Sequence, residues 1–368
     1  LLKISNIENY TVQCLKNQPM KEIICTLHIH STYSDGSGDY PSIADAALKT
    51  DVDVIILTDH NVLVRGLEGY RKGHERRVLV LTGEEVHDQN REPQKNHTLV
   101  FGAEKEMSDF APDPQLLMDE VRKAGGLCYL AHPFEFALPM INEPDISWVS
   151  WDVNGFTGLE LWNGLSEFKT VVHNMRDALK YLYFPEMMAH APLDATLRKW
   201  DELLNKGMKV FAVGGADAHG IKIRKSIIKR TVYPYEFHFR AINNHILIDE
   251  PLNGNLAHDK KCIYQALRKG SSFIGYDLPA STRGFRFIVE DGEGQHAMGE
   301  TVKLDTGATA MIKLPEKAMI RLIHDGRLVH ELTNSDRMAY PISEPGFYRV
   351  ECKIHYLGKE RGWIYSNP

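Results

Sequence analysis

The chain has 368 residues, a formal net charge of -6, 43% hydrophobic residues and 25% charged residues. This length suits two domains, or one barrel with an appendage, and the composition is that of an ordinary globular protein. No apolar run approaches the roughly 18–20 residues that a membrane span needs. The charge balance offers no basic excess to neutralise nucleic-acid phosphates. We therefore expect neither a membrane nor a nucleic acid as a partner.

The cysteines are scattered and include no C-x-x-C pair (Cys14, Cys25, Cys128, Cys262 and Cys352). This usage indicates small buried side chains in a reducing compartment rather than a disulfide frame or a zinc ribbon. The N-terminus shows no charged-then-apolar signal segment. It also lacks an initiator Met, so an upstream piece can be missing. We expect a cytoplasmic location and keep a homo-oligomer as an option.

Short apolar runs alternate with helix-like segments between residue 22 and about residue 215. Strands are predicted at 23–29, 53–58, 78–82, 97–101, 127–131, 156–162 and 208–213. Helices are predicted at 41–50, 113–124, 166–182 and 194–206, where proline or a capping polar residue starts the segment. Short, doubly apolar strands between helices favour a parallel sheet. Seven of them favour an α/β barrel that is closed or nearly closed.

The pattern changes after about residue 220. Residues 221–240 are rich in lysine, arginine and aromatic residues, and 259–270 predicts one amphipathic helix. From 284 onward only strand-like pieces and turns follow, at 285–290, 309–314, 318–324, 327–333 and 347–356. The Asp-Gly pair at 325–326 is a strong hairpin signal. We interpret 1–283 as the barrel domain, with its motifs in 22–220 and a connection in 221–283, and 284–368 as a small all-β sandwich.

Histidines and carboxylates gather where the predicted strands end, which is where α/β barrels place their active sites. His28 and His30 follow the first strand and, two residues apart, point to the same side. His97 begins its strand, so we expect that strand to run the other way or to present its N-terminal end. The remaining candidates are Asp35 in a Ser-Asp-Gly turn, Asp59 and His60, Glu84 and Glu85, His132, and Asp217 and His219.

Imidazole and carboxylate groups are the ligands that divalent cations such as zinc, manganese and iron accept. Eight or nine of them exceed what one tetrahedral ion uses, so two or three ions that share a bridging carboxylate are predicted. Each motif alone is a weak signal, and Asp-His after a strand also occurs as a capped turn. The metal site is indicated by all the motifs together, in barrel-compatible order. Glu160 ends a strand as well and is predicted either to line a substrate pocket or to pack in the core. Other histidines lack this context and are expected to be structural or exposed: His74, His87, His173, His190 and those from His238 onward.

The motifs resemble those of the polymerase and histidinol phosphatase (PHP) family over roughly residues 22–220. They are His-Ile-His-Ser-Thr-Tyr-Ser-Asp-Gly (28–36), Thr-Asp-His-Asn (58–61), Gly-Glu-Glu (83–85), Ala-His-Pro (131–133) and Asp-Ala-His (217–219). The resemblance implies a distorted seven-stranded, TIM-like βα barrel with a trinuclear zinc, manganese or iron site. Residues 343–351 and 363–368 resemble the carbaryl-hydrolase-like branch, which has a C-terminal β-domain.

Carried over by position, the resemblance implies three groups of ligands. One ion would be held by His28, His30, Glu85 and Asp217, and Glu85 would bridge to a second ion held by His97 and His132. The third ion would be held by Asp35, His60 and His219. Glu84 is the rival of Glu85 as the bridge. Catalytic roles would fall on Asp35, Glu85 and His219.

The leading functional hypothesis is hydrolysis of a small phosphate ester by a metal-bridging hydroxide. Arg65, Arg224, Arg230 and Glu160 are the candidate substrate contacts. A second hypothesis keeps the metals but changes the substrate to a carboxylic ester or an aryl carbamate, with an apolar pocket lined by Tyr233, Tyr235 and Phe237. A third is a metal-stabilised binding module without catalysis. The sequence does not separate the two hydrolytic hypotheses.

Overall fold

The structure is a computed structural model that describes residues 20–368 apart from 226–227 and 305–306, and it leaves the side chains of 223–230 undescribed. The strands are β1 Lys21–Leu27, β2 Val54–His60, β3 Gly69–Lys72, β4 Arg77–Val86, β5 Thr98–Phe101, β6 Leu127–Leu130, β7 Gly158–Asn163, β8 Phe211–Gly215, β9 Lys222–Lys225, β10 Ile228–Thr231, β11 Ile242–Ile248, β12 Ser272–Tyr276, β13 Arg286–Glu290, β14 Gln295–Ala297, β15 Ala308–His324, β16 Arg327–Ile342, β17 Tyr348–Tyr356 and β18 Lys359–Ser366. The α-helices are α2 Tyr40–Ala47, α3 Pro114–Lys123, α4 Gly164–Val171, α5 Met175–Tyr183, α6 Asp194–Asn205, α7 Tyr235–His238 and α8 Leu256–Lys269.

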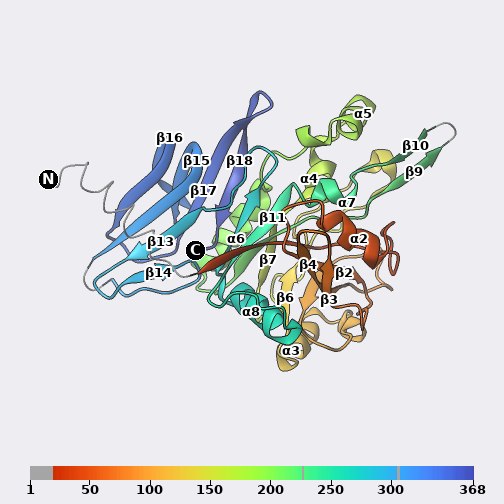
Figure 1. Cartoon of the computed structure of the whole chain (residues 1–368), viewed down its shortest axis with the longest axis horizontal. Coiled ribbons are helices and arrows are strands. Elements are labelled where there is room, and N and C mark those ends of the chain that lie inside the picture. The colour runs from red at the N-terminus through yellow and green to blue at the C-terminus, as the bar shows by residue number, and fades with distance from the viewer. Residues whose placement is uncertain (1–19, 226–227, 305–306) are drawn as a thin grey trace.

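A single mixed sheet of 16 strands organises this α/β fold (Figure 1). Its order is β14-β13-β15-β17-β18-β12-β11-β1-β2-β4-β5-β6-β7-β8, with β16 added to β15 and β3 added to β4. β9 and β10 form a separate hairpin. β8 is the final strand in this spatial order. The segment that follows β8 contacts the segment after β1 through an isolated parallel bridge between Ile29 and Ala218. Within the described residues, the ladder of strands is therefore not closed, and the predicted barrel, closed or nearly closed, stays a prediction.

Strand direction brings the predicted site residues to one edge of the sheet. β1, β2 and β4 are mutually parallel, as are β6, β7 and β8. β5 lies between these blocks and is antiparallel to both β4 and β6. The N-terminal end of β5 therefore lies beside the C-terminal ends of its parallel neighbours. This arrangement brings His97 to the same edge as the ends of β4 and β6.

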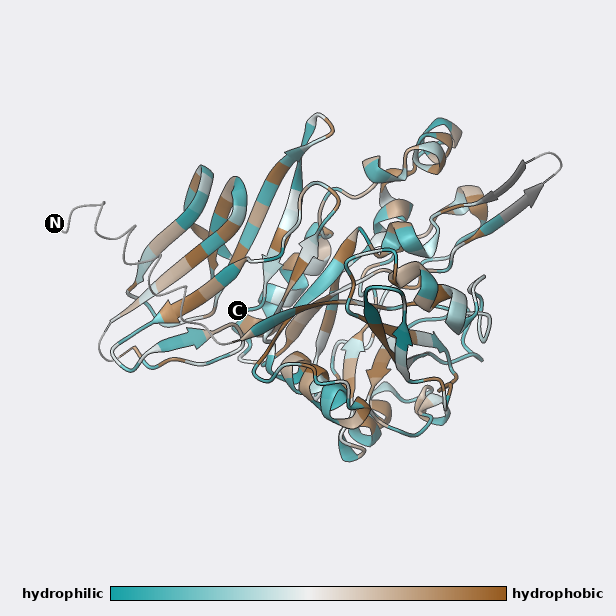
Figure 2. Ribbon diagram, in the orientation of Figure 1, coloured by the Kyte–Doolittle hydropathy of each residue, from teal (hydrophilic) through white to brown (hydrophobic). Residues whose placement is uncertain are grey.

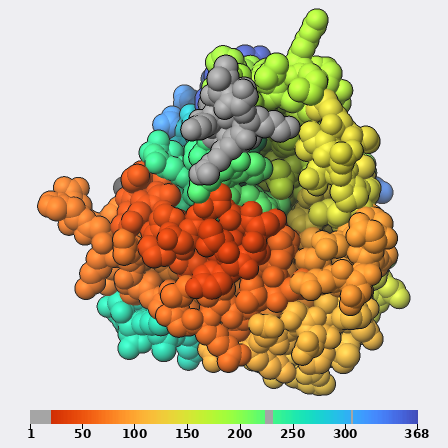
Figure 3. All heavy atoms as spheres, turned by 90° about the vertical axis from the view of Figure 1, so that its right-hand side faces the viewer, coloured from red at the N-terminus to blue at the C-terminus, as the bar shows by residue number. Residues whose placement is uncertain are grey.

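Apolar side chains fill the space enclosed by β1, β2, β4, β5 and β8. Leu27, Ile56, Leu81 and Phe101 belong to one buried cluster, which Leu267 of α8 also joins. Figure 2 shows brown residues along these central strands and teal residues over much of the surrounding helices. Seen from the right-hand side of Figure 1, the first segments of the chain (red to orange) meet yellow and green segments on one face (Figure 3).

The C-terminal strands extend this sheet instead of forming a separate one. β18 pairs with β12, placing Phe273 opposite Ser366 and Ile274 opposite Tyr365. The predicted strands at 309–314 and 318–324 are one strand, β15, whose register shifts between Lys313 and Ala318. The C-terminal strands, for which the sequence predicts a small sandwich, are therefore hydrogen-bonded to the main sheet through the pairing of β18 with β12. A domain boundary at 283/284 stays a prediction.

The predicted helix at 166–182 is two helices, α4 and α5. Val172 leaves the helical conformation, and the side chain of Asn174 then caps α5 by accepting from the backbone N–H groups of Arg176 and Asp177. An asparagine at this position starts a new helix more favourably than it continues an old one. None of the helices in the described parts of the chain has the length and hydrophobicity needed to cross a membrane.

Candidate metal centre

Glu85 lies at the centre of the predicted site, at the end of β4. Its Oε1 lies 2.8 Å from His97 Nδ1 and 2.9 Å from His132 Nε2. Its Oε2 lies 3.1 Å from His28 Nε2, 3.2 Å from His30 Nε2 and 3.2 Å from His60 Nδ1. One buried carboxylate thus faces five imidazoles from four different segments of the chain.

Two further carboxylates extend the cluster. Asp217 Oδ1 lies 3.5 Å from His28 Nε2 and 3.4 Å from His30 Nε2. Asp35 Oδ1 lies 3.2 Å from His219 Nε2, and Asp35 Oδ2 lies 3.7 Å from His60 Nε2. The structure therefore brings all nine predicted ligands together. Four overlapping sets have ligand atoms within 4.8 Å of one another: His30, Asp35, His60 and His219; His28, His132 and Asp217; His28, His30 and Glu85; and His60, Glu85 and His97.

Several buried atoms in this cluster have no hydrogen-bond partner. They are His28 Nε2, His30 Nε2, His60 Nδ1, His97 Nε2, His132 Nδ1 and Glu85 Oε2. Buried polar atoms are rarely left unpaired, and such an atom needs an explanation such as an ion. Imidazole nitrogens and carboxylate oxygens at these distances fit a divalent cation placed between them. The donor set therefore fits two or more cations.

The backbone is strained at three of these residues. His28, His132 and Asp217 have φ values of 62°, 27° and 47°, in the region that favours glycine. Such conformations persist only where the surroundings over-determine them, and they concentrate at functional sites. The strain directs the three side chains toward one point at the edge of the sheet.

Burial and neighbouring charges shift the pKa values of the clustered groups in opposite directions. Burial raises the pKa of Glu85, but His28, His60 and His97 outweigh it and hold that pKa well below its usual value. Burial lowers the pKa of His132, but Glu135 and Glu85 outweigh it and raise the pKa to about 9. A metal-binding imidazole must be neutral, so cations would compete with protons for these nitrogens.

The cluster opens to solvent on the side of the third predicted ligand group. The side chain of Asp35 is 57% exposed, that of His60 is 23% exposed and that of His219 is 14% exposed. The other predicted ligands are buried. Tyr235 connects the two backbone segments beside this opening, because its hydroxyl lies within hydrogen-bond distance of the carbonyl oxygens of His30 and His219. A substrate would therefore approach along this side.

The two glutamates of the Gly-Glu-Glu motif lie on opposite faces of β4. Glu85 faces the imidazoles, whereas both oxygens of Glu84 accept from the backbone N–H of Met107. Glu84 and Arg65 line a different cavity of about 280 Å³, together with Lys105. Arg65 therefore lies with Glu84 rather than with Glu85. The side chains of Arg224 and Arg230 lie outside the described residues.

Glu160 lies behind the candidate ligands and is only 1% exposed. Its Oε1 accepts from His28 Nδ1 at 2.7 Å, and its Oε2 accepts from the backbone N–H of His132 at 2.7 Å. Both carboxylate oxygens are therefore occupied by candidate metal ligands. Glu160 also lines a small crevice together with His132 and Asn163, and its role as a substrate contact stays a prediction.

Three buried residues near the cluster, His87, Glu135 and Lys169, are not among the predicted site residues. The ring of His87 stacks on that of His97 with 4.3 Å between centroids. Glu135 Oε1 accepts from Lys169 Nζ at 2.6 Å, and Glu135 Oε2 lies 3.6 Å from His132 Nδ1. The contact between Glu135 and Lys169 joins residues 34 positions apart in the chain. The one local hint is that His87 lies two positions after Glu85 and so on the same face of β4.

An apolar wall borders the exposed side of the cluster. Phe168, Met188 and Tyr233 line a small crevice together with Asp217 and His219. Tyr233 donates its hydroxyl hydrogen to the carbonyl oxygen of Tyr181 at 3.0 Å and is buried. Among the side chains that the structure describes, no lysine or arginine lines this crevice.

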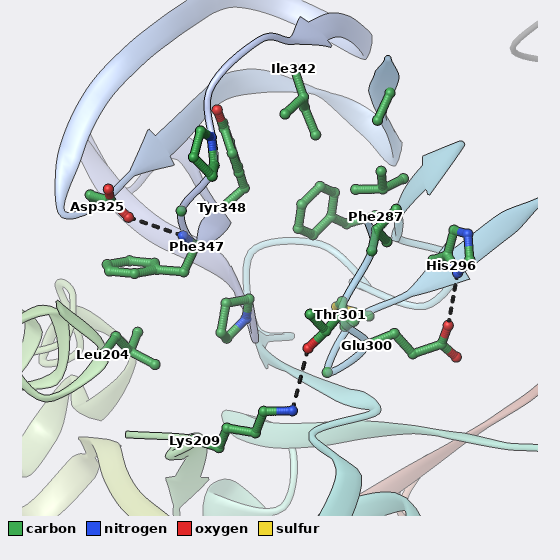
Figure 4. A pocket seen from close by; sticks show the side chains of 18 of the residues that line it. Leu204, Lys209, Phe287, His296, Glu300, Thr301, Asp325, Ile342, Phe347 and Tyr348 are labelled. Carbon is green, nitrogen blue, oxygen red and sulfur yellow. Dashed lines mark hydrogen bonds and ion pairs between the residues drawn. The ribbon is translucent and has the colours of Figure 1, made fainter. Parts of the chain in front are cut away.

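A separate cavity of about 620 Å³ lies away from the metal ligands, between the end of α6 and the C-terminal strands (Figure 4). Phe287, Ile342 and Phe347 line it, and Lys209 Nζ donates to Thr301 Oγ1 at 3.4 Å along its margin. None of the nine predicted ligands lines this cavity.

Comparison with known proteins gives a partial match. No curated protein matches the chain. A two-domain protein from Bacteroides vulgatus, described as containing a predicted PHP-like metal-dependent phosphoesterase, is 17% identical with a TM-score of 0.43, and the alignment covers 95% of each chain. A candidate metal-dependent phosphoesterase from Bifidobacterium adolescentis is 12% identical with a TM-score of 0.34, covering 57% of this chain and 92% of the other. Both similarities are too distant to carry an argument about function. The family model of the PHP domain matches residues 26–112, the stretch that contains His28, His30, Asp35, His60, Glu85 and His97.

Proposed function

We propose that this chain is a metal-dependent hydrolase, and that its substrate is a small phosphate ester. The observation that carries the proposal is that the buried nitrogens His28 Nε2, His30 Nε2 and His60 Nδ1 converge on Glu85 Oε2 without hydrogen-bond partners. A purely structural metal site is closed and uses four ligands. This cluster has nine candidate ligands and opens to solvent at Asp35.

The proposal assigns two or three divalent cations, zinc, manganese or iron, to the cluster. His28, His30, Glu85 and Asp217 would hold one cation; Glu85, His97 and His132 a second; and Asp35, His60 and His219 a third. Bound cations of this kind supply a hydroxide at neutral pH and offset charge on the attacking and leaving oxygens. Asp35 and His219, on the open side, would contact the substrate. We also propose that β1, β2 and β4 to β8 correspond to the distorted seven-stranded barrel implied by the sequence resemblance, and that residues 284–368 form a C-terminal β-domain.

The phosphate contact is proposed for Arg224 or Arg230, which follow the last metal motif in the sequence. Arg65 is less suited, because it lines the cavity of Glu84 on the other face of β4. A guanidinium group would bind phosphate oxygens in a bidentate manner. Replacing each arginine singly with methionine should raise the KM for a phosphate ester if that residue makes the contact.

A second candidate function, hydrolysis of a carboxylic ester or an aryl carbamate, is favoured by the apolar wall. Phe168, Met188 and Tyr233 lie beside Asp217 and His219 and suit an aromatic group better than a phosphate. The resemblance of residues 343–351 and 363–368 to the carbaryl-hydrolase-like branch also supports this candidate. Tyr235, also expected to line an apolar pocket, instead holds the loops of His30 and His219.

The test measures metal content and the hydrolysis of p-nitrophenyl phosphate and p-nitrophenyl acetate, before and after chelation. Two or more ions per chain with chelator-sensitive phosphate release would support the phosphoesterase. Chelator-sensitive release from the acetate alone would favour the carbonyl substrates. Metal binding without turnover of either compound would leave a metal-stabilised binding module. Less than one ion per chain after metal is restored, with no turnover, would refute the hydrolase.

A further inference from the structure

The three strained ligand candidates form one group. His28, His132 and Asp217 have φ values of 62°, 27° and 47°, and their ligand atoms lie within 4.8 Å of one another. They come from three separate segments, after β1, β6 and β8. A left-handed conformation at a non-glycine residue needs contacts that hold it. The strand β7 and the start of α4 provide those contacts.

Glu160 of β7 holds two of the three residues through its two carboxylate oxygens. Oε1 accepts from His28 Nδ1–H, which leaves the lone pair of His28 on Nε2. That Nε2 is the atom that faces Glu85 and Asp217 without a hydrogen bond. Oε2 accepts from the backbone N–H of His132, at the point where the chain is strained.

Asn163 connects Glu160 to the third residue. Its Nδ2 donates to Glu160 Oε2 at 2.9 Å and to Asp217 Oδ2 at 3.2 Å. Its Oδ1 caps α4 by accepting from the backbone N–H of Ser166 at 2.8 Å. Because Asn163 is both the cap of a helix and the donor to two carboxylates, the start of α4 fixes the network.

Gly215 provides the space that Glu160 occupies. A Cβ atom at this position would lie 1.4 Å from Glu160 Oε1. The φ of Gly215 is not in the left-handed region, so the glycine is required by the close approach and not by its own conformation. Any side chain at 215 would displace Glu160 from His28.

We propose that Glu160 and Asn163 are positioning residues that preorganise three candidate ligands of the proposed metal centre, His28, His132 and Asp217, for divalent cations. The inference rests on the proposed metal centre but not on the identity of the substrate. Carboxylates that accept the second N–H of a metal-binding histidine fix its tautomer and orientation, and their loss weakens metal binding. Glu160 carries out this role for His28 and also restrains the backbone of His132.

The test is Co²⁺ titration of the chelated wild-type chain and of Glu160→Gln, followed by the visible absorption of the bound ion. Glutamine has the shape of glutamate but only one acceptor oxygen, so it cannot accept from both His28 and His132. We expect Co²⁺ binding at one subsite to weaken about 10- to 100-fold, with a changed absorption spectrum. Binding at Asp35, His60 and His219 should stay unchanged.

Glu167→Gln is the matched control. Glu167 is a buried glutamate on α4, and it accepts from Trp162 Nε1 at 2.7 Å and from the backbone N–H groups of His190 and Ala191. The same substitution there creates the same shortage of acceptors away from the metal ligands. We expect this control substitution to lower the Tm of the metal-free chain. It should keep the Co²⁺ affinity within about twofold of wild type, a much smaller change than the 10- to 100-fold weakening expected for Glu160→Gln.

Two results would overturn the inference: wild-type affinity and spectrum in Glu160→Gln, or equal weakening in Glu167→Gln. If Glu160→Gln does not fold, Co²⁺ titration of Asn163→Asp replaces it as the test. Aspartate keeps the helix cap but places a carboxylate against Glu160 and Asp217, so we expect Co²⁺ affinity to change. Its control is Asn174→Asp, at the cap of α5. If the wild-type chain binds Co²⁺ but does not hydrolyse p-nitrophenyl phosphate, the proposed phosphoesterase is refuted, whereas the positioning role of Glu160 and Asn163 is not.

Discussion

The buried ion pair of His245 should make the stability of this protein depend on pH above neutrality. His245 lies on β11, with Nδ1 2.7 Å from Glu22 Oε1 and Nε2 3.2 Å from Asp277 Oδ2. Thr282 Oγ1 also lies 2.7 Å from Nε2. Glu22 belongs to β1, whereas Asp277 and Thr282 lead into the C-terminal strands. The perturbation is His245→Gln, which removes the titrating group and keeps a polar side chain.

Burial alone lowers the pKa of His245, but Asp277 and Glu22 outweigh it and raise the pKa to about 9. A raised pKa stabilises the folded state fully below the unfolded value of about 6.5, and this contribution disappears as the pH rises through 9. Each unit of pKa difference corresponds to about 1.4 kcal/mol, so the contribution is about 3 kcal/mol. The pKa of Asp277 is lowered to about 2, chiefly because His245 outweighs the effect of burial. The contribution of Asp277 is therefore present above 3.8 and is lost only as the pH falls through 2.

The assay is urea denaturation of wild type and His245→Gln between pH 6 and pH 9.5, with chelator present so that metal binding does not contribute. The difference in free energy of unfolding should shrink by about 3 kcal/mol as the pH rises across this range. The exposed His355, replaced with glutamine, provides a control that should stay parallel to wild type. A difference that stays constant or grows with pH would refute the reasoning.

Three other predictions follow from the described contacts. Glu85→Gln should remove at least one ion per chain by elemental analysis and lower chelator-sensitive hydrolysis by more than about 100-fold, beyond the range of outer-sphere partners. Glu84→Gln, on the opposite face of β4, should retain the ions, and an equal loss in both variants would contradict the geometry. Removing metal with chelator should lower the Tm, and restoring free metal to 100 times its Kd should return about 2.7 kcal/mol of stability in urea; an unchanged Tm would contradict this. Arg349→Met should cost about 3 kcal/mol or more in urea, because the buried guanidinium group donates two hydrogen bonds to Asp201 and one to Glu351. Co²⁺ affinity should not change in this variant, and a loss of stability below 1 kcal/mol would contradict the assignment.

Much of the sheet could be predicted from local pattern, because doubly apolar runs and helix caps are local signals. The order of His28, His60, Glu85 and His132 after such runs predicts their convergence once the strands are parallel. His97 lies at the start of its strand, so it reaches the same edge only if that strand runs in the opposite direction. β5 does so, because it is antiparallel to both β4 and β6. The choice between Glu84 and Glu85 could not be made, since it depends on which face of β4 is turned inward.

Other features could not be predicted because their partners are remote in sequence. β11 contains Asn243, Asn244 and His245, which interrupt its apolar pattern, yet all three are buried and paired. The pairing of β18 with β12 joins segments about 90 residues apart and has no local signature. The sequence predicts Glu160 as a strand end and a candidate substrate contact but not its partners, because its contacts with His28 and His132 join three distant segments.

The pairing of β12 with β18 matters for any attempt to divide the chain. A cut at 283/284 falls in a loop, but it separates two strands that are hydrogen-bonded neighbours. The N-terminal piece would keep β12 with one side uncovered, and this short strand contains Phe273, Ile274 and Tyr276. Uncovered, apolar edge strands pair with other chains and aggregate. Shortened versions of this protein therefore need a redesigned β12 edge, for example with an inward-pointing lysine, before the metal centre can be studied in isolation.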